Sequence, residues 1–278
     1  MPSASPSTAT AIASSYYDSS DADRFYAEIW GGEDIHIGLY ASPGESIRRA
    51  SARTVEELMA LAGDGGPAWT VVDLGSGYGG AARRLAASWG CRVEAVNISR
   101  VENERHRLLN REAGLSERIR VHDASFDACP LPDGCADLVW SQDAILHAGD
   151  RAAVLREVAR LLRPGGGFVL TDPMAADGVD PAQLRPILDR IHLADLGSPQ
   201  RYRRWGEAAG LQLEHWSDRT GMLVLHYSRV RQELRSRRRE LGTTISEDYL
   251  ERMETGLGHW IEGGRNGSLC WGLMRFRR

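Results

Sequence analysis

The stretch VVDLGSGYGG at residues 71–80 decides how this chain folds. An apolar run leads into an aspartate and then into a glycine-rich turn, as it does after the first strand of many parallel sheets that hold nucleotide-like ligands. Gly75, Gly77 and Gly80 satisfy the pattern G-x-G-x-x-G, which permits a tight turn from a strand into a helix. By itself this pattern indicates either a ligand-binding turn or a purely structural one.

Asp73 narrows the choice of ligand because it lies two residues before the first glycine. A carboxylate aimed into this turn repels a pyrophosphate, but it attracts a ligand that carries an ammonium and a sulfonium. S-adenosylmethionine is such a ligand, and we expect Asp73, Gly75, Ser76 and Gly77 to contact it. A nicotinamide-dependent oxidoreductase is disfavoured, because that class uses an acid at the end of the second strand, where this chain has Asn97.

Predicted strands and helices alternate from residue 68 onward, which is typical of a parallel sheet covered on both faces. Strands are expected at 69–73, 92–97, 119–122, 138–141, 167–171, 211–216 and 268–276. Helices are expected at 79–89, 101–113, 150–162, 181–195, 199–209, 225–241 and 246–261. The regular alternation ends after residue 171, and the additional helices would lie over the carboxyl edge of the sheet, where open α/β folds bind ligands. We expect them to form a substrate lid.

The composition excludes several classes of protein. All 34 basic residues are arginines, so a P-loop lysine and a Schiff-base lysine are both excluded. The net charge of −4 gives no overall attraction to nucleic acid or to an anionic membrane, so neither is expected as a partner. The four cysteines show no metal-ligand spacing and no disulfide framework, which indicates a reduced, cytoplasmic protein without a bound metal.

The chain is short enough for a single compact domain. Residues 1–15 are rich in serine, alanine, threonine and proline, and we expect a disordered tail there. Residues 16–278 are expected to form one domain, with an aromatic N-terminal segment at 16–50 and lid insertions at about 178–198 and 218–265. No stretch approaches the ~18 apolar residues that a membrane helix needs. The sequence does not determine the oligomeric state.

This organisation resembles the class I S-adenosylmethionine-dependent methyltransferases from Tyr16 to Arg278. The resemblance implies a seven-stranded, mostly parallel, Rossmann-like sheet with helical lid insertions. It also implies that Asn97 and Ile98, at the end of the second strand, hold the cofactor ribose. The family more often has an acid at the position of Asn97, so Asn97→Asp is expected to keep or tighten the grip on the ribose.

The same resemblance assigns cofactor contacts to the next two strands. The adenine is expected beside Asp123, Ala124 and Ser125, although Asp123 is alternatively a solvent-exposed turn residue. Ser141 and Gln142, at the end of the fourth strand, are expected near the ribose and the sulfonium.

Five further segments carry a more specific resemblance. They are YYDSSDADRFYAEIWGGEDIHIGLY at 16–40, WSQDAILHAGD at 140–150, TDPM at 171–174, PILDRI at 186–191 and HWIEGGRNG at 259–267. Together they resemble the sarcosine/dimethylglycine N-methyltransferases that make glycine betaine, which implies methylation of sarcosine and dimethylglycine. SQDAILH also resembles a segment of the phosphoethanolamine methyltransferases, so phosphoethanolamine or another small metabolite is the alternative acceptor. That similarity places His147 and Tyr17 at catalytic positions. A catalytically silent protein that binds a partner is disfavoured by the intact glycine turn.

Methyl transfer to an amine requires the acceptor nitrogen to lose its proton and to lie in line with the methyl group. His147 is our candidate proton acceptor, and alternatively it caps the turn before the helix at 150–162. Arg190 is our candidate for holding the substrate carboxylate, and alternatively it forms a surface salt bridge.

Aromatic side chains are expected to stabilise the cationic methylated nitrogen. The candidates are Tyr17, Tyr26, Trp30 and Tyr227. His36 in IHIGLY is expected either to contact the substrate or cofactor or to satisfy a buried backbone group.

Overall fold

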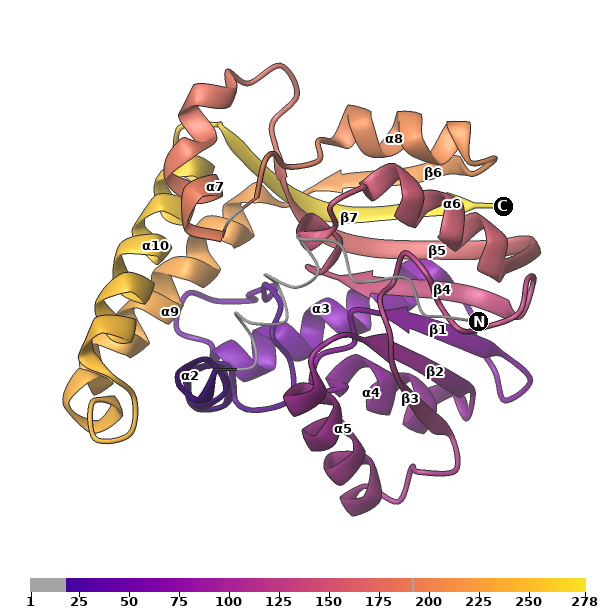
Figure 1. Ribbon diagram of the computed structural model, residues 1–278, viewed down its shortest axis with the longest axis horizontal. Coiled ribbons are helices and arrows are strands. Elements are labelled where there is room, and N and C mark those ends of the chain that lie inside the picture. Colours follow the sequence, from indigo (N-terminus) through magenta and orange to yellow (C-terminus); the bar gives the residue numbers. More distant parts are fainter. Residues whose placement is uncertain (1–18, 192) are drawn as a thin grey trace, which may run out of the picture.

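A computed structural model describes residues 19–191 and 193–278. Within these residues one sheet has the strand order β3-β2-β1-β4-β5-β7-β6, as Figure 1 shows. The strands are β1 (Thr70–Leu74), β2 (Arg92–Asn97), β3 (Ile119–Asp123), β4 (Ala136–Gln142), β5 (Leu162–Ala175), β6 (Gln212–Asp218) and β7 (Leu269–Arg277). All neighbouring pairs are parallel except those of β7, which runs antiparallel to β5 and β6. The predicted seven-stranded, mostly parallel sheet is therefore confirmed.

Helices flank the sheet, and most of them begin at a capping side chain. They are α2 (Ser20–Trp30), α3 (Ile47–Ala62), α4 (Gly80–Trp89), α5 (Arg100–Glu112), α6 (Arg151–Leu161), α7 (Arg185–Ile191), α8 (Pro199–Ala208), α9 (Thr220–Leu241) and α10 (Glu247–Arg265). Short 3₁₀ turns occupy Ile145–His147 and Pro181–Leu184. Ser99 caps α5 and Asp150 caps α6, and each side chain accepts a hydrogen bond from a backbone N–H in the first turn.

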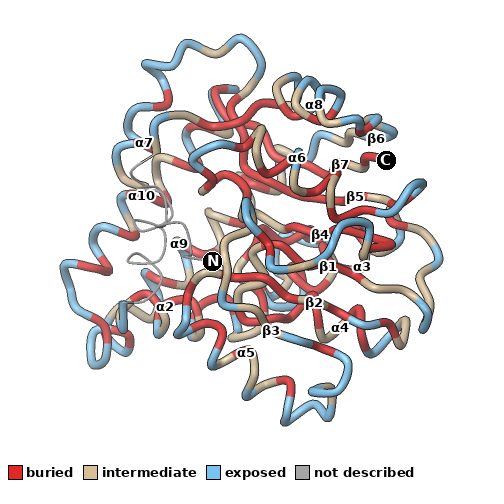
Figure 2. The backbone as a smooth tube through the Cα atoms, turned by 45° about the vertical axis from the view of Figure 1, so that its right-hand side comes forward, coloured by how far each residue is buried: buried red, intermediate tan, exposed pale blue. Residues whose placement is uncertain are grey.

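The central strands β1 and β4 are buried along nearly their whole length, and they lie in the red interior of Figure 2, whereas the edge strands β3 and β6 are partly exposed. Along β1, Val71 packs with α3 and α4 on one face, whereas Val72 packs with α6 on the other. This alternation follows from the two-residue period of a strand and explains why the parallel strands read as continuous apolar runs.

Strand β5 is longer than the sequence predicts. It begins at Leu162, directly after α6, whereas the expected strand spans 167–171. Pro164 is accommodated because the ladder with β7 begins only at Gly167, so the missing N–H of the proline costs no bond to that strand.

The elements expected to form a lid gather at one end of the sheet, on the left of Figure 1. Helices α9 and α10 are inserted between β6 and β7, and they share an apolar cluster with α2. Helix α7, which follows β5, packs on Trp260 of α10 in a second cluster. The expected disordered tail at 1–15 and the candidate Tyr17 lie outside the described residues. None of the described helices is long and apolar enough to cross a membrane.

Candidate functional site

The turn between β1 and α4 needs its glycines. Gly75 and Gly77 have φ angles of 76° and 50°, in the left-handed region that glycine adopts readily. A Cβ on Gly75 would lie 2.3 Å from the Cβ of Ala144, which follows β4. The backbone amide of Gly75 donates to the carbonyl of Val96 at 2.8 Å and so ties the turn to β2. The turn therefore exposes bare backbone at the carboxyl ends of β1 and β2.

Asp73 places a buried carboxylate beneath this turn. Asp73 is 3 % exposed, and no donor in residues 19–191 or 193–278 forms a hydrogen bond to its side chain. Burial raises the pKa of Asp73 to about 7. The nearby charge of His36 lowers this pKa, whereas that of Asp34 raises it. A buried carboxylate without a donor fits a cationic ligand group, because such a group would supply the missing partner.

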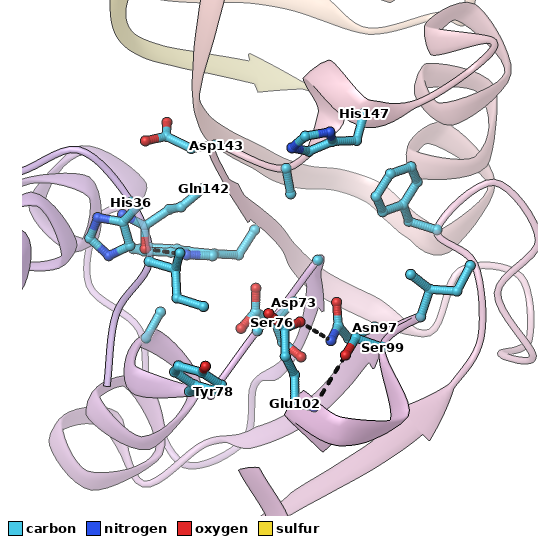
Figure 3. Close-up of a pocket in the computed structure, with 18 of the residues that line it drawn as sticks. His36, Asp73, Ser76, Tyr78, Asn97, Ser99, Glu102, Gln142, Asp143 and His147 are labelled. Atoms are coloured by element: carbon cyan, nitrogen blue, oxygen red, sulfur yellow. Dashed lines mark hydrogen bonds between the residues drawn. The ribbon is translucent and has the colours of Figure 1, made fainter. Parts of the chain in front are cut away.

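A cavity opens over this turn, and we name it the glycine-turn cavity (Figure 3). Its lining includes eight residues predicted from the sequence to hold the cofactor: Asp73, Gly75, Ser76, Gly77, Asn97, Ile98, Ser125 and Gln142. The carboxyl ends of β1, β2 and β4 and the loop after β3 supply them, because the ends of parallel strands meet at one edge of the sheet.

Glu102 supplies an acid near the end of β2 that the sequence analysis missed. It lines the glycine-turn cavity from the first turn of α5, and Nδ2 of Asn97 donates to its Oε2 at 2.9 Å. The two side chains lie together in Figure 3. With Glu102 in this position we instead expect Asn97→Asp to weaken the grip on the ribose, because Asp would replace the donor with a second carboxylate beside Glu102.

Three predicted cofactor residues lie outside the lining of the cavity. Ser141 is fully buried and donates to the carbonyl of Leu74 at 2.8 Å, while its neighbours Trp140 and Gln142 line the cavity. Alternation along β4 turns Ser141 away. Asp123 instead accepts hydrogen bonds from Asn103 and Arg107 of α5, at 2.7 and 2.8 Å.

Ala124 packs against the core instead of lining the cavity. The residues of the loop after β3 that line the cavity are Ser125, Phe126 and Asp127, further along the sequence than the predicted 123–125. Phe126 and Asp127 were missed because the sequence does not show how far this irregular loop travels before it turns inward.

A second cavity, the aromatic cavity, lies between the sheet edge and the lid helices. Its lining contains all five described residues predicted from the sequence to bind substrate: Tyr26, Trp30, His36, Arg190 and Tyr227. Trp260 of α10 and His226 of α9 also line this cavity. Tyr227 and Trp260 lie with their ring centroids 5.5 Å apart. Segments separated by more than 200 residues in sequence thus share one small apolar site.

The two cavities meet at four residues that line both: Ile35, His36, Asp143 and His147. We name these the junction residues. Figure 3 shows His36, Asp143 and His147 around the end of the glycine-turn cavity that is remote from Asn97 and Glu102. A group bound in one cavity could therefore react with a group bound in the other at this junction.

His36 is paired with a buried carboxylate at the junction. Its Nε2 lies 3.5 Å from Oδ1 of Asp34, and both residues are buried. Burial opposes protonation, but the hydrogen bond and charge of Asp34 outweigh it, so the pKa of His36 is raised above its usual value. Its Nδ1 lies 3.2 Å from the carbonyl oxygen of Ile37, which agrees with the alternative of a bond to buried backbone. His36 also lines both cavities, and its contact with substrate or cofactor stays a prediction.

Asp143 is held in an unusual backbone conformation. It is the one non-glycine residue among those described with a positive φ, at 49°. Its carboxylate accepts from Ile37 N at 2.7 Å, Thr171 Oγ1 at 2.8 Å and Trp271 Nε1 at 2.8 Å. These bonds from the N-terminal segment, β5 and β7 offset the strain of the left-handed conformation. The sequence analysis missed Asp143 although it directly follows Gln142.

His147 is neutral at physiological pH. Its burial, together with the charge of Arg151, lowers its pKa to about 4. It occupies the 3₁₀ turn before α6, and Asp150 rather than His147 caps that helix. The imidazole can therefore accept a hydrogen bond at the junction, and it is a weaker base than the expected histidine titrating near neutrality.

Arg190 projects from α7 with its charge uncompensated. No carboxylate of the described residues lies within ion-pair distance of it, and its Nη2 contacts Sδ of Met253 at 2.8 Å. The alternative of a surface salt bridge thus finds no support in residues 19–191 and 193–278.

Among the residues that the structure describes, no group of three or more histidine, cysteine, aspartate or glutamate side chains could hold a metal ion.

The comparisons with known proteins agree with this geometry. Residues 72–170 match the family model described as a methyltransferase domain. The dimethylglycine N-methyltransferase of Parasynechococcus marenigrum (strain WH8102) is 64 % identical over 97 % of this chain and 96 % of its own. The sarcosine/dimethylglycine N-methyltransferase of Halorhodospira halochloris is 51 % identical over 95 % of this chain and 94 % of its own.

A solved structure shows the same architecture. It is described as a sarcosine dimethylglycine methyltransferase from Galdieria sulphuraria, is 46 % identical and superimposes with a TM-score of 0.89. The match covers 94 % of this chain and 98 % of the other. With near-complete coverage in both directions, the chain belongs to the family of the sarcosine/dimethylglycine N-methyltransferases.

Proposed function

We propose that this protein methylates the nitrogen of sarcosine and of dimethylglycine, with glycine betaine as the final product. The observation that carries the proposal is the uncompensated Arg190 in an aromatic cavity that meets the glycine-turn cavity at His36, Asp143 and His147. A small amino acid bound with its carboxylate at Arg190 would present its nitrogen at this junction. The names of the relatives support the same acceptors.

The glycine-turn cavity fits S-adenosylmethionine, which when bound supplies a methyl group activated by a sulfonium. Asp73 would hold its ammonium, since the buried carboxylate has no donor among the described residues. Asn97 and Glu102 would hold its ribose hydroxyls, and the loop at 125–127 would lie beside its adenine. These assignments leave the junction end of the cavity for the methionine sulfur.

The junction residues would orient the acceptor nitrogen. Neutral His147 can accept the hydrogen bond or the proton of the amine, directly or through a water molecule. The faces of Tyr26 and Tyr227 would stabilise the positive charge that develops on nitrogen. We propose that α7, α9 and α10 act as the lid that excludes water from this step.

A single cation suits a carboxylate better than a phosphate ester. Arg190 is the one arginine among the described residues that line the aromatic cavity, and the chain has no lysine. Phosphoethanolamine would bring about two negative charges at neutral pH, which Arg190 alone would not balance. The structure therefore favours the amino acids over the phosphorylated alternative.

The cysteines support a reducing compartment. Cys91, Cys129, Cys135 and Cys270 are all free thiols, and three of them are buried. We therefore place the protein in the cytoplasm.

An acceptor screen with radiolabelled S-adenosylmethionine tests the proposal. Sarcosine and dimethylglycine should accept label, whereas glycine should react poorly and dimethylethanolamine, which lacks the carboxylate, much more slowly. Arg190→Ala should raise KM for dimethylglycine about tenfold or more, because a partly buried charge pair is lost, and leave cofactor affinity nearly unchanged. If neither acid accepts a methyl group, the proposal is wrong.

A further inference from the structure

His226 and Trp30 leave two hydrogen-bond donors unused in the wall of the aromatic cavity. Both residues line the cavity, with exposed fractions of 0 % and 4 %. Nε2 of His226 and Nε1 of Trp30 are buried, and neither has a partner among the described residues. Buried polar groups without partners are uncommon, and each indicates a missing ligand or water molecule.

The hydrogen bonds of His226 determine which of its nitrogens carries the proton. The backbone N–H of Gly38 donates to Nδ1 at 3.1 Å, and the Tyr40 hydroxyl lies 3.1 Å from the same atom. A backbone amide can only donate, so Nδ1 must be unprotonated. Burial, with a smaller contribution from the charge of His36, lowers the pKa of His226 to about 3, so the ring is neutral. Its single proton therefore lies on Nε2, which makes this atom a donor.

The indole N–H of Trp30 is a donor without any acceptor function. Its ring centroid lies 5.5 Å from that of His226. The two unused donors thus belong to adjacent rings, and both rings line the aromatic cavity together with Arg190. None of these three residues lines the glycine-turn cavity, so they belong to the part of the aromatic cavity that the two cavities do not share.

We propose that His226 Nε2–H and Trp30 Nε1–H bind the carboxylate of the acceptor together with Arg190. This inference rests on the proposed function and makes it more specific. The two carboxylate oxygens would accept hydrogen bonds from side chains of α2, α7 and α9. The edges of these rings, where the N–H groups lie, are positive and repel a cation. They therefore orient the zwitterionic acceptor with its nitrogen toward the junction and exclude amines that lack an acid group.

Variants of His226 separate this role from a structural one. The Oδ1 of His226→Asn can occupy the position of Nδ1 and accept from Gly38, but no donor remains at the position of Nε2. His226→Gln places its amide N–H near the position of Nε2 instead. Trp30→Phe keeps an aromatic ring and removes only the N–H, and Trp205→Phe on α8, outside both cavities, is the matched control.

The assay measures KM and kcat with dimethylglycine, KM for S-adenosylmethionine, and the melting temperature of each full-length variant. His226→Asn and Trp30→Phe should each raise KM for dimethylglycine about tenfold, the effect of losing one hydrogen bond to a charged group. Cofactor KM and kcat should change less than about twofold, since the interaction is equally present in ground and transition states. His226→Gln should recover part of the lost affinity.

Two results would contradict the inference and leave the proposed function intact. The first is that both His226→Asn and Trp30→Phe have the same KM for dimethylglycine as the wild-type enzyme. The other is an equal loss of cofactor and acceptor affinity together with a lower melting temperature, which would show a structural role. If the wild-type protein methylates neither sarcosine nor dimethylglycine, the proposed function falls and this inference falls with it.

Discussion

Gly256 of α10 creates the space that Arg190 occupies. A Cβ built on Gly256 would lie 2.0 Å from Nε and 2.2 Å from Cζ of Arg190. Ordinary contact begins at 3.4 Å, so Gly256→Ala must push the guanidinium away by about 1.4 Å or more. The arginine side chain is flexible, whereas the buried helix is not, so the arginine moves and the helix stays folded.

We expect this displacement to weaken acceptor binding selectively. Misplacing a charge-assisted pair by more than 1 Å forfeits much of the ~2–5 kcal/mol that such a pair contributes, so kcat/KM for dimethylglycine should fall about tenfold to a hundredfold. The melting temperature should stay constant or rise, because alanine is favoured over glycine in a helix interior by about 1 kcal/mol. The affinity for the cofactor should not change.

Steady-state kinetics and thermal denaturation check this prediction, with Gly258→Ala as the control. Gly258 lies on the same helix, but a Cβ there would meet its nearest neighbour, Nη1 of Arg231, at an ordinary 3.6 Å. Gly258→Ala should therefore keep its activity. A Gly256→Ala enzyme with wild-type kcat/KM for dimethylglycine would refute the reasoning, as would an equal loss in both variants.

Two further predictions concern the cofactor. Because the pKa of Asp73 is raised to about 7 and a cationic ligand prefers the ionised carboxylate, the Kd for S-adenosylhomocysteine should rise about tenfold from pH 8 to pH 6. Calorimetry should find weaker and nearly pH-independent binding in Asp73→Asn, and equal wild-type affinities at the two pH values would contradict the assignment. Asn97→Asp should weaken binding about fivefold or more, because it sets a second carboxylate against Glu102. Tighter binding by this variant would show that Glu102 turns away from the ribose.

The sequence was a good guide wherever a local pattern has a single physical cause. An apolar run, an aspartate and closely spaced glycines can form little other than a strand and a tight turn, so the position of Asp73 at the sheet edge was predictable. The order of strands and helices followed from hydrophobic periodicity and from capping residues such as Asp150. The family resemblance then identified the acceptor candidates, and Arg190 and Tyr227 do line one cavity.

Tertiary structure decided which way each side chain faces and what it meets. Ser141 turns into the core because of the pleat of β4, and Asp123 is taken by Asn103 and Arg107 of α5. Neither contact is encoded in spacing, because each joins residues that are brought together only by the packing of the sheet. The role proposed for His226 depends on one bond to the backbone of Gly38, 188 residues away in sequence. Composition and motifs thus determine the fold and the kind of ligand, whereas hydrogen-bond partners, protonation states and cavity walls arise only when distant segments pack together.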